Sequence, residues 1–194
     1  MRILSVCVAD LLAEHKFISK EKVEICRYGL ENLITSLLEI LSVLILSIIF
    51  NNEVCTIIFL TSFISLRRYT GGYHANTKLG CYAVLLAIYL IFMLMIKHMP
   101  VEFALAFEIT SLSFAIFMVF RYAPIVNGNK NINETERKAF RRLGIILTLV
   151  SSGFVVLGIV ICPHNKGILS ISAGQLVVSA SMLAAILMKR RCEQ

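Results

Sequence analysis

Two residues of the chain have the chemistry of a nucleophile and its base. His74 and Cys81 lie seven positions apart in the stretch 67–81, which reads Arg-Arg-Tyr-Thr-Gly-Gly-Tyr-His-Ala-Asn-Thr-Lys-Leu-Gly-Cys. A cysteine attacks a carbonyl carbon as its thiolate, and a nearby histidine or cationic group lowers the pKa of a thiol and supplies the base. The stretch is polar and basic between two apolar runs. It therefore predicts a Cys/His pair at a membrane surface.

A single straight helix would keep this pair apart. Seven residues separate the two side chains by about 10.5 Å along a helix axis, although both share a face. A hydrogen bond between them needs roughly 3 Å. We therefore predict that the segment 72–80 is not one helix, and the residues suited to break it are Gly71, Gly72, Asn76 and Gly80. A pair formed between two chains is one alternative, and an apolar cysteine beside a surface histidine is another.

The composition is that of a membrane protein. Hydrophobic residues make up 58% of the 194 residues, and the mean hydropathy is +0.81, whereas soluble domains are about 45–50% apolar. The net charge of +7 then reports topology instead of a nucleic-acid partner. The six cysteines lack the paired spacings of a metal site or a disulfide framework. We predict an all-α polytopic protein with one membrane domain over 1–194, without metal, cofactor or nucleic acid.

The apolar runs predict six transmembrane helices after an amphipathic, interfacial helical region over 1–32. The second run is shorter than the roughly 20 residues that a straight span needs. It is either a short span or it borrows length from the segment after Arg67, which would bring 70–72 to the membrane interface. The predicted spans are about 33–50, 54–66, 79–99, 101–120, 143–162 and 168–188, within a bundle over 33–188 and before a tail over 189–194.

The basic residues give this arrangement an orientation. All but two of the 19 Lys and Arg residues, Lys97 and Lys166, lie on one side of the six spans. Positively charged loops face the cytoplasm. We therefore predict that both termini, the stretch 67–81 and the long polar loop 121–142 are cytoplasmic.

The run from Arg67 to Ala75, followed by Cys81, resembles the signature of the accessory gene regulator protein B (AgrB) family. These are bacterial membrane cysteine endopeptidases that process a quorum-sensing propeptide. The resemblance extends to chain size, to the charged N-terminal region and to the run from Arg121 through Asn127 to the basic cluster ending at Arg142. It therefore covers most of the chain.

The resemblance implies an activity, a partner and a location. His74 and Cys81 would be catalytic, without a metal. The enzyme would remove the acidic C-terminal tail of a short precursor that has an amphipathic N-terminus. An acyl-enzyme thioester would then close to a thiolactone or lactone ring. The location would be the bacterial cytoplasmic membrane.

Several further residues are candidates for supporting roles. Arg67 and Arg68 could stabilise an oxyanion or hold the acidic tail, or they could simply mark a cytoplasmic span end. Gly71 and Gly72 would shape the backbone, with an oxyanion role for their N–H groups as an alternative. The cluster of Lys130, Lys138, Arg141 and Arg142 could be a solvated positive-inside loop or a site for anionic lipid, and the resemblance adds docking of the propeptide.

Two acidic residues fall inside predicted spans. Glu39 and Glu108 are costly there and are therefore functional candidates that face the bundle. They also support a different function, a small transporter of a peptide or solute with these carboxylates in its pathway. A scaffold or sensor subunit without chemistry is the third possibility. The apolar faces that six small spans leave open favour a homodimer.

Overall fold

In the computed structural model of the chain, the regular secondary structure of the described residues is helical. These are residues 6–8, 10, 11, 13, 23–73, 77–125, 133–163 and 165–192. Within them there is no strand, although Gly71 and Ile125 form one isolated parallel bridge. The chain divides into two compact units, Met1–Ile49 and Phe50–Gln194. The fold is therefore all-α where it is described, as the composition predicts.

The first unit consists mainly of helix α2, Val23–Ile49. Residues 6–8, 10, 11 and 13 are also helical, and Arg27 Nη2 lies 2.6 Å from Asp10 Oδ1. The helix begins well before Leu33, the predicted start of the first span. No proline interrupts residues 23–32, and Gly29 meets nothing within 4 Å. The end of the predicted interfacial region, residues 23–32, and the predicted first span therefore form one continuous helix.

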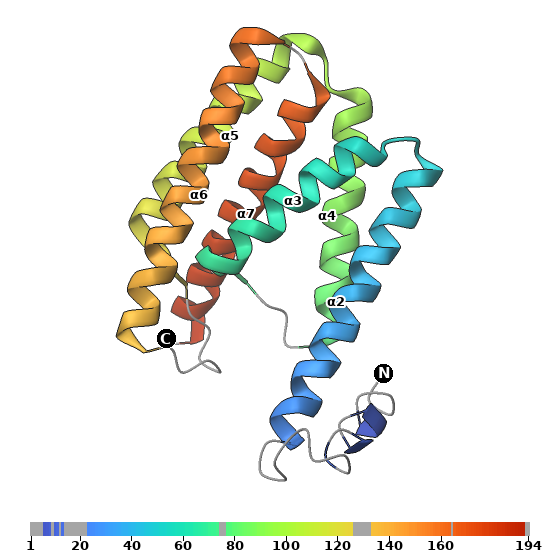
Figure 1. The fold of residues 1–194 in the computed structure, drawn as a ribbon. Coiled ribbons are helices and arrows are strands. Elements are labelled where there is room, and N and C mark those ends of the chain that lie inside the picture. Colours follow the sequence, from blue (N-terminus) through green and yellow to red (C-terminus); the bar gives the residue numbers. More distant parts are fainter. Residues whose placement is uncertain are drawn as a thin grey trace. The chain divides into compact units, whose positions relative to one another are not determined.

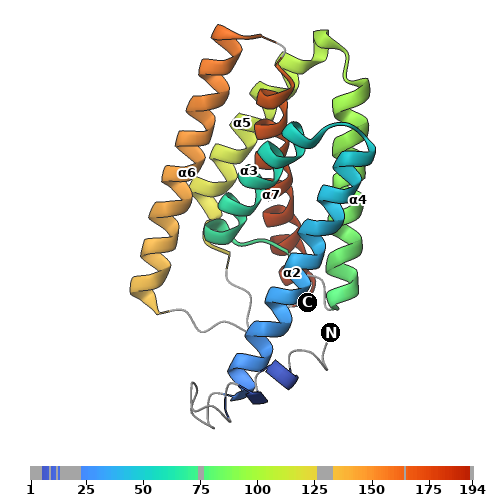
Figure 2. The same ribbon diagram turned by 45° about the vertical axis from the view of Figure 1, so that its right-hand side comes forward.

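The described part of the second unit holds five helices with α7 at their centre. They are α3 (Glu53–Thr70), α4 (Lys78–His98), α5 (Val101–Tyr122), α6 (Glu134–Ile161) and α7 (Lys166–Cys192). Helix α7 packs against each of the other four (Figure 1). Helices α3, α5 and α7 run in one direction, and α4 and α6 run in the other (Figure 2).

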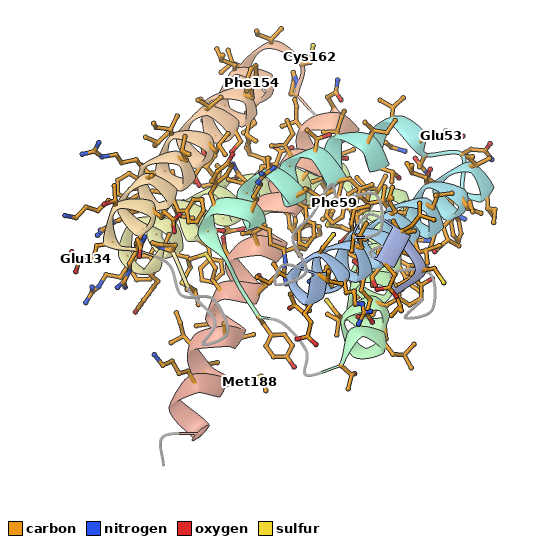
Figure 3. The ribbon with its side chains drawn as sticks, turned by 60° about the horizontal axis from the view of Figure 1, so that its bottom comes forward. Glu53, Phe59, Glu134, Phe154, Cys162 and Met188 are labelled. Atoms are coloured by element: carbon orange, nitrogen blue, oxygen red, sulfur yellow. The ribbon has the colours of Figure 1, made fainter. Side chains whose placement is uncertain are left out.

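Small residues let α7 occupy the centre. A Cβ atom at Gly174 would lie 2.8 Å from Ser62 Oγ of α3, and that hydroxyl donates to the carbonyl of Ile171 at 3.2 Å. Helices in membranes associate through such close backbone approaches because lipid is as apolar as their side chains. Large apolar side chains are accordingly both inside and outside: Phe59 is fully buried and Phe154 is 61% exposed (Figure 3).

Among the described residues, five helices are long and apolar enough to cross a membrane. They are α2, α5 and α6 in full, α4 from Leu79, and α7 as far as Lys189. Helix α3 is not among them, because its 18 residues include Glu53, Arg67 and Arg68. The helix continues past Arg67 to Thr70. The helix that contains the second apolar run therefore extends into the polar segment after Arg67, which is one of the two alternatives for this run. At 1.5 Å per residue α3 is roughly 27 Å long, and its crossing stays a prediction.

The polar loop expected over 121–142 is shorter than predicted, because α6 begins at Glu134. A capping box starts the helix: the Asn133 side chain accepts from a backbone N–H, and Glu136 Oε2 accepts from the Asn133 N–H at 3.3 Å. The exposed residues Arg137, Lys138, Arg141 and Arg142 therefore lie on its first turns. Charge alone suggested a loop there, whereas the capping signal Asn-x-x-Glu indicated a helix.

The close approach at Gly174 should be sensitive to a single methyl group. Gly174→Ala would bring a Cβ atom to 2.8–3.2 Å from Ser62 and from the Phe63 nitrogen, which forces α3 away from α7. We expect a loss of about 1–3 kcal/mol in stability, measured by thermal unfolding in detergent. Gly153→Ala is the matched control, because nothing lies within 4 Å of that glycine. Equal melting temperatures for the two variants would contradict this packing.

Candidate active site

A short non-helical link joins α3 to α4. Helix α3 ends at Thr70, and the Gly71 N–H still donates to the carbonyl of Arg67 at 3.0 Å. Gly71 then has φ +74°, a conformation that glycine adopts without strain. Residues 71–73 are not helical, and α4 begins only at Lys78. The prediction that 72–80 is not one helix is confirmed.

The segment after α5 holds one side of this link. The Ile125 N–H donates to the Thr70 carbonyl at 2.9 Å, and Gly71 pairs with Ile125. A Cβ atom at Gly71 would overlap the carbonyl oxygen of Ile125. On the α6 side, a Cβ atom at Gly144 would lie 3.2 Å from Thr70 Cγ2. Glycine at these positions therefore permits a close approach of backbones.

Helix α7 holds the other side of the link. The Tyr73 N–H donates to the carbonyl of Ser181 at 3.0 Å. Gly72 is buried, and a Cβ atom there would lie 2.5 Å from Ser181 Oγ. The chain therefore lies directly on α7 just before it reaches His74.

Arg67 joins the link to α7 through its side chain. Its Nη1 donates to Ser181 Oγ at 3.1 Å, and its Nη2 donates to the carbonyl of Tyr73. The guanidinium carbon lies 5.5 Å from the centroid of the Phe63 ring. This half-buried arginine therefore supports the local backbone, whereas Arg68 is exposed.

Cys81 lies in the first turn of α4. Thr77 caps this helix: its side chain accepts from the Gly80 N–H at 3.1 Å, and its carbonyl accepts from the Cys81 N–H at 3.0 Å. Cys81 is half-buried and forms no disulfide with another described cysteine. Leu85 is one helical turn further on the same face. It packs against a core cluster of Phe63, Leu66, Met118, Val119, Ala123, Val178 and Met182.

The core cluster brings the two ends of the link near each other. Met182 belongs to the cluster and follows Ser181, which binds Tyr73. Leu85 packs on the same cluster one turn beyond Cys81. Only three residues, 74–76, connect Tyr73 to Thr77. His74 is one of these three residues and lies outside the described residues.

Comparison with known proteins decides the family. The family model described as Accessory gene regulator B matches residues 5–188. The chain belongs to the AgrB family. Membership indicates a role in the accessory gene regulator system of quorum sensing.

Named relatives of this AgrB-family chain agree with the match. An AgrB-like protein of Clostridium perfringens strain 13 is 30% identical over 169 residues, which cover 84% of this chain and 79% of the relative. An AgrB-like protein of Listeria welshimeri is 25% identical over 166 residues, 85% of this chain and 79% of the relative. The protein FsrB of Enterococcus faecalis is 23% identical over 164 residues, 76% of this chain and 68% of the relative. No solved structure matches.

The basic cluster predicted in this AgrB-family chain is only partly described. Lys138, Arg141 and Arg142 are exposed on α6, and Lys130 lies outside the described residues. Arg141 Nη2 donates to the carbonyl of Phe120 at 3.3 Å, which ties the start of α6 to the end of α5. Lys138 and Arg142 present their charges to the surroundings at the same end of α6.

The two carboxylates in the predicted spans, Glu39 and Glu108, are not part of the link. Glu108 is buried at 3% exposure in α5, and the 14 residues from there to Tyr122 span about 21 Å of helix. Glu39 is half-buried in α2, in the other unit. Among the described residues, no three His, Cys, Asp or Glu side chains come together as metal ligands.

Two contact residues of the link escaped the sequence analysis. Ile125 follows a proline in a polar region, and Ser181 is one of several serines in an apolar helix. Their contacts use backbone groups and one hydroxyl. A polar residue inside a predicted span was the only signal for Ser181, and nothing in the sequence distinguishes Ile125.

The bridge between Gly71 and Ile125 can be tested without any assay of function. Gly71→Ala adds a Cβ atom at a positive φ and against the Ile125 carbonyl, so the hydrogen bond from Ile125 to Thr70 should break. We expect at least about tenfold faster deuterium exchange at the Ile125 amide, which corresponds to a loss of about 1.4 kcal/mol or more. Mass spectrometry of the peptide that ends α5 measures it. Gly29→Ala should leave this exchange unchanged.

Proposed function

We propose that the chain is a membrane cysteine endopeptidase that trims a short signal-peptide precursor and closes it into a ring. Cys81 is the nucleophile and His74 is its base. Support comes chiefly from one observation: Cys81 lies in the first turn of a helix, α4, and Tyr73, the last described residue before His74, is hydrogen-bonded to α7. The link and both termini face the cytoplasm in this proposal, as the distribution of Lys and Arg favours.

The start of α4 suits an anionic sulfur. Backbone N–H groups in a first helical turn carry partial positive charge, and the N-terminal end of a helix favours negative charge. Cys81 lies in that turn, after the cap at Thr77. Its half-buried position also limits contact with water.

The first chemical step cleaves the precursor. His74 takes the proton from the Cys81 thiol, and the thiolate attacks the carbonyl carbon of the peptide bond before the tail. The C–N bond then breaks, and the leaving amine takes the proton from His74. The products are an acyl-thioester on Cys81 and the free C-terminal tail.

The second step closes the ring. A cysteine thiol or serine hydroxyl of the bound peptide gives its proton to His74 and attacks the thioester carbon, and Cys81 leaves as thiolate and takes that proton back from His74. For a cysteine this exchanges one thioester for another, so little energy is lost. Water would hydrolyse the thioester instead, and the site must exclude it.

The basic surface near the site fits the expected substrate. Lys138, Arg141 and Arg142 are exposed on the first turns of α6. Such a patch attracts an acidic tail and raises its rate of encounter. Anionic lipid is the competing ligand of this surface.

Replacing the nucleophile should abolish trimming without unfolding the protein. We expect Cys81→Ala to lower the rate of tail release at least about 10³-fold, because no other group forms the thioester. Mass spectrometry of a precursor with an acidic tail, incubated with the enzyme in vesicles, measures the rate. Cys162→Ala is the matched control, since Cys162 is an exposed free cysteine at the opposite end of α6 from Glu134 (Figure 3). Undiminished trimming by Cys81→Ala would overturn the proposal.

The same variants separate the enzyme from a transporter. His74→Ala should reduce tail release by about 10²–10⁴-fold. A transporter that relies on Glu108 would tolerate both the Cys81 and the His74 substitutions. It would instead lose uptake or export of the peptide on Glu108→Gln, which leaves the proposed cleavage chemistry untouched.

A further inference from the structure

Ser181 of α7 contacts the link through both its backbone and its hydroxyl. Its carbonyl accepts the Tyr73 N–H at 3.0 Å, and its Oγ accepts from Arg67 Nη1 at 3.1 Å. The same hydroxyl donates to the carbonyl of Val178 at 2.8 Å. A serine within a helix commonly bonds only to its own helix. The contacts to α3 and to the link therefore distinguish Ser181.

The hydroxyl of Ser181 has a fixed orientation. Its proton is directed to Val178, so an oxygen lone pair faces Arg67. Arg67 then lies between two acceptors, the Ser181 hydroxyl and the Tyr73 carbonyl. Both hydrogen-bonding groups of the Tyr73 backbone are thereby held, the N–H by Ser181 directly and the carbonyl by Arg67.

The hydrogen bonds to the Tyr73 backbone bear on the proposed reaction because Tyr73 directly precedes the proposed base. His74 is the next residue, and its backbone nitrogen belongs to the same peptide unit as the Tyr73 carbonyl. A shift of that carbonyl therefore moves the start of the His74 residue. The Cys81 side of the site is fixed separately, by the capped first turn of α4.

We propose that Ser181 is a positioning residue, which acts through Arg67 to fix the peptide unit that leads into His74. The proposal rests on the proposed function, because the position of His74 matters only if it serves Cys81. Ser181 itself touches neither the substrate nor the sulfur in this arrangement.

Loss of the hydroxyl should misplace the base without removing it. Ser181→Ala keeps the carbonyl that binds Tyr73 but frees one side of the Arg67 guanidinium. A displacement of about 1 Å in a catalytic group can lower a rate by about 10². We expect kcat for tail release to fall by about 10- to 100-fold, and KM to stay within about twofold.

The matched control is two residues away on the same helix. Ser179 is buried, and its hydroxyl donates to the carbonyl of Gln175 within α7. Ser179→Ala therefore removes an equally inaccessible serine hydroxyl without touching the link. It should retain the wild-type kcat.

A second readout follows the pair of residues without any peptide substrate. The rate of Cys81 alkylation by iodoacetamide is measured against pH in vesicles, by mass spectrometry of the peptide that contains Cys81. His74→Ala gives the profile of a thiol without its base. The Ser181→Ala profile should move toward it, and the Ser179→Ala profile should match the wild type.

Several results would overturn the positioning role. One is a Ser181→Ala variant with wild-type kcat and a wild-type alkylation profile. Another is a loss of kcat that Ser179→Ala shares, with both profiles unchanged, since that is a general loss of structure. A third is additivity of the two substitutions. If Ser181→Ala lowers kcat by the same factor in the Arg67→Lys variant as in the wild type, Ser181 does not act through Arg67.

Failure of the proposed function gives a different result. Trimming by Cys81→Ala would overturn the endopeptidase, whatever the alkylation data show. A wild-type alkylation profile equal to that of His74→Ala would overturn the Cys/His pair and the role of Ser181 together. A normal wild-type profile with an unaffected Ser181→Ala overturns the positioning role alone.

Discussion

Backbone groups that leave a helix inside an apolar bundle must find new partners, and this constraint shapes the whole second unit. Water and lipid cannot serve the groups of residues 70–73 where they are buried. The structure satisfies them from three directions: Ile125 bonds to Thr70, Ser181 binds the Tyr73 N–H, and Arg67 binds the Tyr73 carbonyl. Arg67 thus stabilises the non-helical residues that follow α3, and its hydrogen bonds to the link and to α7 hold its side chain within the fold.

The two residues of the proposed pair belong to different kinds of structure, Cys81 to a helix and His74 to a short link between helices. One partner of the proposed pair stands on the capped first turn of α4, where helical hydrogen bonds fix it. The other belongs to a segment whose entry point is fixed by tertiary contacts alone. Leu85, one turn beyond Cys81, and Met182, next to Ser181, pack in one core cluster, so the core joins the described residues on both sides of the link. Precise sites are generally built in this way, on elements that packing holds in place.

The sequence predicts what depends on local pattern and charge. The apolar runs give an all-α membrane protein, and the glycines around His74 give the break between α3 and α4. The same reasoning misjudged the start of α6, because it weighted charge over the capping signal at Asn133. Contacts such as Ser181 with Arg67 join residues 114 apart in sequence. No periodicity or motif encodes them, since they depend on how whole helices pack.

The distance in sequence between α3 and its partner has a consequence for how the protein is made. Helix α3 carries three charged residues. The hydroxyl that accepts from its Arg67, that of Ser181, is synthesised 114 residues later, and Gly174, which lies against Ser62, also belongs to α7. A nascent chain therefore contains both His74 and Cys81 long before it contains the anchor for the link between them. The contacts of the link with Ser181 can therefore form only after α7 has been synthesised.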